Sequence, residues 1–226
     1  MGTSRKLSRK FRAAQGDKDL ELLLSSSSSY KICGIVEYDG FIKRSIDPEG
    51  ISLIRELSLD EIVQNELIES IHNLSFVDYS FANQDIESSM EIGIESDIPN
   101  ISSEIKGRFK NHKVAKYIYK GVQALELPSE IKSKVKQTIL NLKEQDRKKY
   151  RKKYKNLFYF EHLYYAENVS IVLENTSELD AKTSIKSTNI TPSISLSKDL
   201  KVEVTFPNSD KCPFAAKVSS IKDLID

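Results

Sequence analysis

Residues 157–173 read LFYFEHLYYAENVSIVL, and they open the stretch that decides the fold. An aromatic run leads into Val169–Leu173, where apolar side chains take alternate positions. Leu200–Phe206 alternates in the same way, and Pro213–Val218 closes the stretch with the letters PFAAKV. Alternation with a period of two is typical of a strand that buries one face. Residues 157–221 are therefore predicted to form a long antiparallel β region.

The rest of the chain predicts a mixture of strands and helices. Lys31–Tyr38 and Phe41–Ile46 indicate a β-hairpin, because Asp39-Gly40 between them suits a two-residue turn. Residues 58–74 and 129–155 carry apolar side chains at helical spacing, and we expect Ser58 and Ser129 to cap these helices. The predicted fold class is α+β.

We expect two parts along the chain. Residues 1–29 are predicted to be a basic tail that ends in a serine-rich linker, and residues 30–226 to form one α+β domain. Cations surround Leu7 and Phe11 in the tail, so that it could lie on an anionic membrane surface. The cations chosen as candidate contacts in this tail are Arg9, Lys10 and Arg12.

The charge is strongly segregated, although the net charge of the 226 residues is only +1. Residues 47–104 hold 14 acidic residues and one basic residue, whereas residues 106–155 hold 17 basic and four acidic residues. Such asymmetry indicates an anionic partner or contact between the two halves. No signal peptide and no apolar run of membrane-spanning length is present. With Cys33 and Cys212 far apart, a cytoplasmic location is expected.

No motif of an enzyme is present: the chain lacks a P-loop, a dinucleotide-binding loop, a zinc-protease helix and a nucleophile elbow. Glu161 and His162 are neighbours on a predicted strand, so their side chains should point to opposite faces. We therefore expect a protein that is not an enzyme, and we assign no catalytic, cofactor-binding or metal-ligating residue.

A basic run stands out at residues 147–155, where seven of nine residues are Lys or Arg and two are Tyr. Such a run could bind anionic lipid head groups. It could also bind nucleic acid, through attraction to phosphates and stacking on the tyrosines. The candidate contact residues in this run are Lys148, Lys149, Arg151, Lys152 and Lys153.

Taken together, the β segments resemble the gasdermins, particularly their bacterial members, over about two thirds of the chain. The order of segments is similar: a hairpin at Ile86–Tyr119, a Lys-rich helical middle, the aromatic strand, a Ser/Thr-rich hairpin at Val169–Phe206 and the PFAAKV strand. In bacterial gasdermins an acylated cysteine lies close to the N-terminus, whereas the first cysteine here is Cys33.

The resemblance implies a twisted antiparallel sheet with two long β-hairpins and flanking helices. It also implies a defence protein that causes cell death by moving from the cytoplasm to an anionic membrane and forming pores as a homo-oligomer. Activation by a protease that removes a terminal peptide would follow, with Ser219–Asp226 as the short peptide available here. The residues expected to insert with the hairpins are Met90, Ile92, Ile94, Val169, Ile171, Leu173, Val202, Val204 and Phe206.

Two other functions fit the same residues. The protein could be a cytosolic binding module whose basic helix holds nucleic acid. It could also be an assembly module in which the basic helix binds an acidic protein partner, including the acidic half of a second copy. Membrane pore formation, nucleic-acid binding and protein assembly are therefore all open at the level of sequence.

Overall fold

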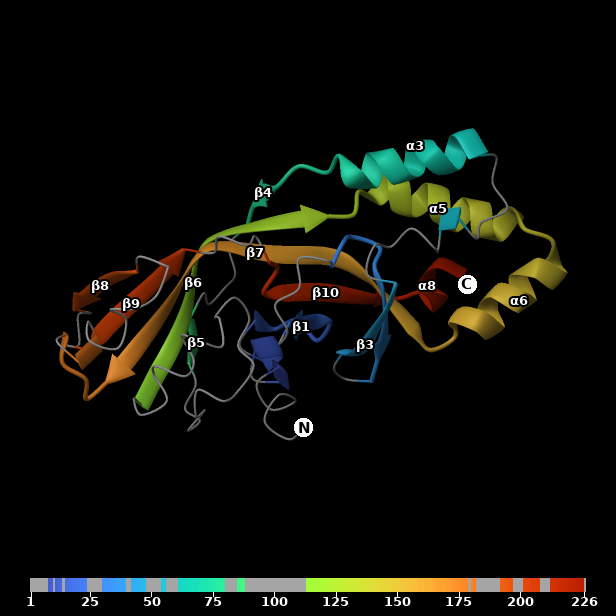
Figure 1. Cartoon of the computed structure of the whole chain (residues 1–226). Helices are drawn as coiled ribbons and strands as arrows, with labels where there is room; N and C mark the ends of the chain where they lie inside the picture. The colour runs from blue at the N-terminus through green and yellow to red at the C-terminus, as the bar shows by residue number, and fades with distance from the viewer. Residues whose placement is uncertain are drawn as a thin grey trace.

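The computed structural model describes thirteen segments of the chain, and for residues 85–87, 113–117 and 225 only the backbone. The described residues are 8–9, 11–13, 15–23, 30–39, 42–47, 54–55, 61–79, 85–87, 113–178, 180–181, 192–196, 201–207 and 212–225. The expected caps and turns at Ser58 and Gly40 lie outside them. Among the described residues, one antiparallel sheet runs the length of the molecule and helices gather at one end of it (Figure 1). The predicted α+β class is confirmed.

Strand β7, Leu157–Glu174, is the longest strand and holds the sheet together. Its first half lies between β2, Ile35–Tyr38, on one edge and β10, Ala215–Ser220, on the other. Its second half lies between β6, Lys113–Glu126, and β9, Val202–Pro207. The aromatic run and the alternating segment are thus one continuous strand, whereas the sequence had suggested two.

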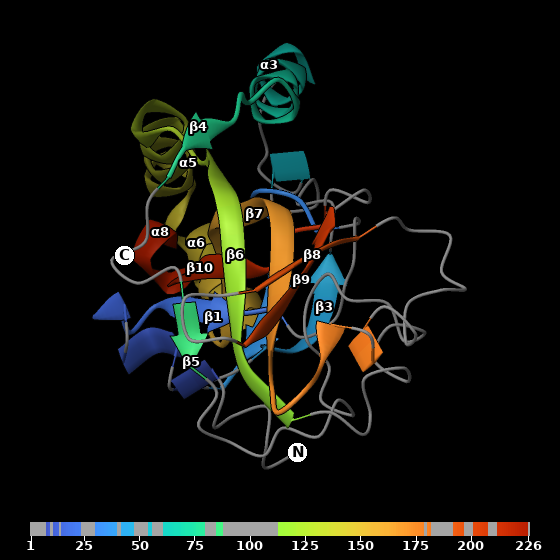
Figure 2. The same cartoon turned by 90° about the vertical axis from the view of Figure 1, so that its left-hand side faces the viewer.

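Shorter strands extend both halves of the sheet. Figure 2, which looks along the molecule from the β8 end, shows β6, β7 and β9 side by side. The predicted hairpin at residues 30–46 is confirmed, because β3 pairs with β2 in an antiparallel manner. The bounds of the outer strands are β1 Leu20–Leu22, β3 Ile42–Asp47, β4 Val77–Asp78, β5 Asp85–Glu87 and β8 Ser193–Leu196.

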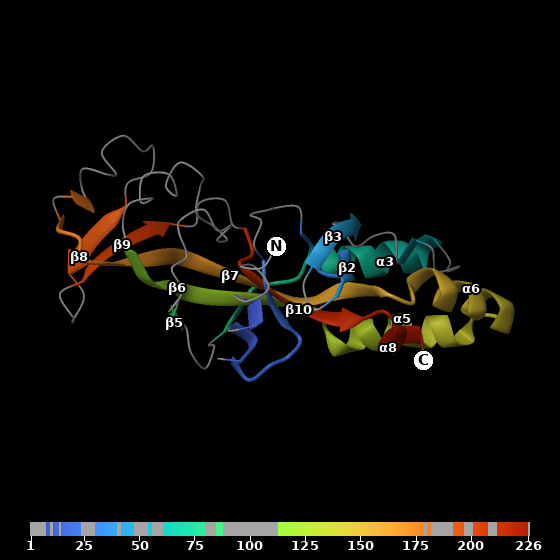
Figure 3. The same cartoon turned by 90° about the horizontal axis from the view of Figure 1, so that it is seen from below.

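The helices pack at the β2–β10 end (Figure 3). Helix α3, Glu61–His72, confirms the core of the helix predicted at residues 58–74. The single helix predicted at 129–155 is wrong: α5, Ser129–Asn141, ends where Leu142 turns to an extended conformation, and α6, Glu144–Tyr154, follows. Pro128, not Ser129, is the N-cap of α5. A four-residue helix α8, Lys222–Ile225, ends the described chain.

The description of residues 1–29 as a tail is also wrong for its described part. Leu20–Leu22 forms strand β1, which pairs with β10, and Leu23 donates a backbone hydrogen bond to Phe214. Phe11, Leu20 and Leu22 are buried in the core. Phe11, one of the two apolar residues that suggested membrane contact, is therefore packed in the core, whereas Leu7 lies outside the described residues.

Near Gly121, the positions of β6 and β7 whose side chains face the core change from even to odd residue numbers. In β6 the core residues are Val122 and Ala124 on one side of Gly121 and Tyr119 on the other, so the buried positions change from even to odd numbers. The same change occurs in β7 around Glu167, which lies beside Gly121. Gly121 has a φ of +61°, a conformation that favours glycine. Because of this change, β6 and β7 turn side chains toward the same core cluster on both sides of the bend.

Gly121→Ala should destabilise the fold. The left-handed backbone costs a residue with a Cβ about 1–2 kcal/mol, and the new Cβ would lie 2.5 Å from a carboxylate oxygen of Glu167. Urea unfolding of the single variant and of Gly121→Ala in a Glu167→Ala background separates the two costs. We expect most of the loss to persist in the double variant, since the exposed Glu167 side chain can move. A variant as stable as wild type would contradict the role of Gly121.

Candidate functional site

The pairing of β7 with β9 forms an amphipathic β ribbon. Val169 lies opposite Phe206, Ile171 opposite Val204 and Leu173 opposite Val202. All six side chains are buried in one core cluster, as the alternation predicts. The start and end of the segment expected to form the second hairpin, Val169–Phe206, are therefore paired with each other. Strand β8 continues the ribbon on the far edge of β9, with Ile194 packed against the same cluster.

The opposite face of the same ribbon is polar. The Lys120 ammonium on β6 donates a 2.5 Å hydrogen bond to Glu203 on β9, crossing above β7. Between them the Ser170 and Thr205 hydroxyls are 2.7 Å apart. Burial raises the pKa of Glu203, but the hydrogen bonds from Lys120 and Ser170 and the charge of Lys120 more than offset it, so the pKa lies below its ordinary value. Sequence reasoning missed this cluster, because only the sheet register brings these residues together.

The first expected hairpin is described only at its base. β5 pairs with β6 in an antiparallel manner, and Ile86 lies opposite Tyr117. The two ends of the segment Ile86–Tyr119 are therefore side by side, next to the β7–β9 ribbon. Met90, Ile92 and Ile94, the residues expected to insert, lie outside the described residues.

The predicted basic surface on α6 is present. Lys148, Lys149, Arg151, Lys152 and Lys153 are exposed, and the Lys148 ammonium lies 2.8 Å from Glu144 one turn earlier. Tyr150 and Tyr154 point the other way and are buried in the helix-side core, with their ring centroids 5.2 Å apart. The expectation that these tyrosines stack on nucleobases is therefore wrong: at helical spacing they form the buried face of α6. What α6 offers to a partner is positive charge alone.

The cations expected in the N-terminal segment do not join that surface. Arg9 is exposed, and Lys10 lies outside the described residues. The Arg12 guanidinium donates a 2.7 Å hydrogen bond to the Tyr38 hydroxyl and lies 3.6 Å from the Glu21 carboxylate. Burial raises the pKa of Glu21, and the charge of Arg12 acts against this. Arg12 thus links the N-terminal segment to β1 and β2 instead of facing outward.

Among the described residues, Glu161, His162 and Cys33 do not form a catalytic arrangement. Glu161 accepts hydrogen bonds from Lys132 and Ser219, whereas the His162 ring lies 3.4 Å from Glu126. These neighbours thus bind different groups, as the strand geometry predicts. Burial raises the pKa of the Cys33 thiol to about 12, so that it is a poor nucleophile. No group of three His, Cys, Asp or Glu side chains within the described residues is placed to hold a metal ion.

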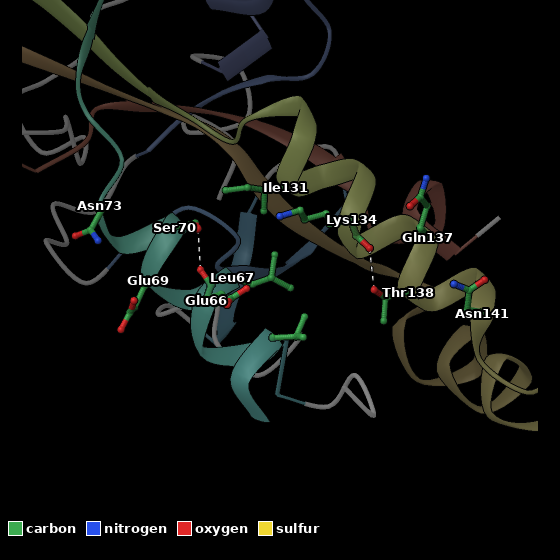
Figure 4. Close-up of a pocket in the computed structure, with 11 residues that line it drawn as sticks. Glu66, Leu67, Glu69, Ser70, Asn73, Ile131, Lys134, Gln137, Thr138 and Asn141 are labelled. Atoms are coloured by element: carbon green, nitrogen blue, oxygen red, sulfur yellow. Dashed lines mark hydrogen bonds between the residues drawn. The ribbon is translucent and has the colours of Figure 1, made fainter. Parts of the chain in front are cut away.

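A groove of about 660 Å³ runs between α3 and α5 (Figure 4). Its apolar lining comes from Val63, Leu67 and Ile131. The Ser70 and Thr138 hydroxyls in its wall donate to carbonyls of their own helices, at 2.7 and 2.8 Å. The rest of the lining is polar or charged, and it consists of Glu66, Glu69, Asn73, Lys134, Gln137 and Asn141.

No protein-family model and no curated protein matches this chain. Among solved structures, the chain is similar to a bacterial gasdermin from Bradyrhizobium tropiciagri, with 8% sequence identity and a TM-score of 0.39. The similarity covers 64% of this chain and 61% of that one. At this level it is a weak structural resemblance and does not assign the chain to that family. Among the described helices, none is long and apolar enough to cross a membrane.

The Lys120–Glu203 pair should make stability depend on pH. The pKa of Glu203 is lower in the folded protein than the ordinary value of 4.5, so the unfolded chain binds a proton first. Its contribution is therefore present above pH 4.5 and is lost as the pH falls below it. Between about pH 5 and about pH 3, unfolding free energy should fall more steeply in wild type than in Lys120→Met. Parallel curves from denaturant titrations would contradict this.

Proposed function

We propose that this protein is a gasdermin-like, pore-forming protein that docks on anionic membranes and inserts β-hairpins as an oligomer. The β7–β9 ribbon carries the proposal. Six apolar side chains are paired across two strands on one face, and Ser170, Thr205 and Glu203 lie on the other. A hairpin with this pattern can turn one face to lipid and the other to water. We place the protein in the cytoplasm before it moves to the membrane.

Strand length fits this proposal in part. A strand that crosses a bilayer needs about 9–11 residues. With 14 residues in β6 and 18 in β7, both strands are long enough. With six residues, β9 is shorter, so insertion requires residues 175–201 to lengthen the ribbon. On insertion, the part of the sheet formed by β9 and the paired ends of β6 and β7 would move away from the helical end. The bend at Gly121 and Glu167 is where these two parts would separate.

The exposed face of α6 is the proposed docking surface. Its five candidate cations lie in one helix of 11 residues, at the end of the sheet far from the ribbon (Figure 1). Each Lys or Arg near an anionic leaflet contributes about 1 kcal/mol of attraction, which salt screens. Among the described cations expected to contact the membrane, Arg9 is also exposed. Arg12 is not part of this proposed surface, because it is bound to Tyr38 and Glu21.

Lys149→Glu with Lys152→Glu should weaken binding to anionic liposomes by about 30-fold or more, since the loss of two attractive charges alone removes about 2 kcal/mol. Dye release should fall in parallel, and wild type should release no dye from neutral liposomes. Cosedimentation and leakage assays measure both, using the chain as given and the chain cut between Val218 and Ser220.

The matched control is Lys18→Glu with Lys31→Glu, which changes the net charge equally at exposed positions outside α6. It should bind liposomes nearly as well as wild type. Absence of leakage from every liposome with both forms of the chain would refute the proposed function. Binding to single-stranded nucleic acid that is lost in the α6 variant, without leakage, would favour the nucleic-acid module instead.

If the ribbon inserts as a strand, every second side chain of β8 should move from water into lipid. Leu196 lies opposite Val202, so its side chain shares the apolar face, whereas Ser195 lies opposite Glu203 on the polar face. Both are exposed before insertion. An environment-sensitive fluorophore on Leu196→Cys should brighten with anionic liposomes, and the same label on Ser195→Cys should not.

The β8 positions suit labelling because Val202 and Val204 are buried in the core, where a new polar group would unfold the protein. The native thiols Cys33 and Cys212 are buried and therefore protected from the label. Equal brightening at positions 195 and 196 would argue against insertion of this ribbon as a strand.

A further inference from the structure

Helix α3 presents a face on which large apolar side chains are exposed in the described part of the chain. Leu67 and Ile71 are its buried side chains, whereas Ile62 is 68% exposed and Val63 is 40% exposed. Phe76 and Val77, just beyond the helix, are exposed as well. Five of the seven large apolar side chains found exposed lie on α3, on the segment after it or on α5. An apolar concentration of this kind indicates a protein contact surface.

The same face of α3 is acidic. The helix carries three glutamates, Glu61, Glu66 and Glu69, and neither Lys nor Arg. All three glutamates are exposed, and no cation of the described residues pairs with them. Glu66 and Glu69 also line the groove between α3 and α5 (Figure 4). A partner for this face therefore needs positive charge together with a surface that can cover Ile62.

Helix α6 has these properties. It holds six basic and two acidic residues. Its exposed Lys149 and Lys152 are three positions apart, as Glu66 and Glu69 are on α3, so both pairs lie on single helix faces. No cation–carboxylate pair of the described residues holds Lys149 or Lys152. The long aliphatic stems of lysine can cover an apolar side chain while their ammonium groups reach neighbouring carboxylates.

We infer that the exposed face of α3 in one copy of this protein binds the exposed face of α6 in a second copy. Within one chain, no ion pair of the described residues joins the two helices. Because the two faces differ, the contact joins unlike surfaces, head to tail, and can add further copies into a ring or a filament.

The contact also covers the cations assigned to membrane docking, so α3 and anionic lipid compete for α6. This consequence rests on the proposed function, whereas the contact itself does not. Exposed ion pairs are individually weak and are screened by salt. The association should therefore be weak, and it should be lost when the protein meets a surface of higher negative charge density.

Sedimentation velocity of the full chain at low salt tests the contact. Wild type should associate reversibly with rising concentration, and the association should weaken about tenfold or more when salt brings the Debye length from about 10 Å to about 3 Å. Glu66→Lys with Glu69→Lys should abolish it, and so should Lys149→Glu with Lys152→Glu. Mixing these two variants should restore association, because each reversed face then meets an opposite charge. All four positions are exposed, and circular dichroism checks that the variants fold.

Three outcomes would overturn the inference: wild type that stays monomeric at low salt, variants that associate like wild type, or a mixture that stays monomeric. Liposome binding separates this inference from the proposed function. Glu66→Lys with Glu69→Lys should bind anionic liposomes at least as well as wild type, since it frees α6. Leakage without self-association supports pore formation and overturns the contact. Self-association with charge-swap rescue but without leakage supports the contact and counts against the pore.

Discussion

The structure depends on one strand being shared between two halves of a sheet. β7 is hydrogen-bonded along 18 residues, first to β2 and β10 and then to β6 and β9. Buried backbone amides and carbonyls need hydrogen-bond partners, and a strand with neighbours on both edges provides them along most of its length. The helical end and the β8–β9 end are therefore joined by one sheet. A movement of one end has to pass through β7.

The bend at Gly121 and Glu167 explains how one core cluster contacts β6 and β7 on both sides of this level. In a flat pleated sheet, a single core would occupy alternate positions throughout each strand. Here the buried positions in β6 and β7 change by one residue at the same level, and the left-handed Gly121 makes this possible. The helix-side cluster is centred on Tyr159, Phe160 and Leu163, while the other cluster takes the apolar face of the β7–β9 ribbon. Local backbone geometry thus positions the ribbon on which the proposed insertion depends.

Charge and burial together decide what α6 and α3 can do. The tyrosines of the basic run are turned into the core, which leaves lysines and arginines outside and removes the stacking that nucleic-acid binding would use. Helix α3 belongs to the acidic segment of the sequence. One side of this helix is buried, and its carboxylates and Ile62 are exposed to solvent on the other side. One surface of positive charge can meet lipid head groups or carboxylates, but not both at once. Competition between these two ligands would couple assembly in solution to arrival at a membrane.

The sequence by itself determined the local elements: the alternation of Val169, Ile171 and Leu173, the hairpin at residues 30–46, and the helical stripes. Periodicity of side chains along a few turns or a few residues is enough to define these. Tertiary structure alone decided that residues 157–174 form one strand, that Leu142 separates α5 from α6, and that Leu20–Leu22 joins the sheet. It also decided that Arg12 is bound to Tyr38 and Glu21, and that Lys120 reaches Glu203. These features depend on contacts between segments far apart in the chain, and no local pattern carries that information.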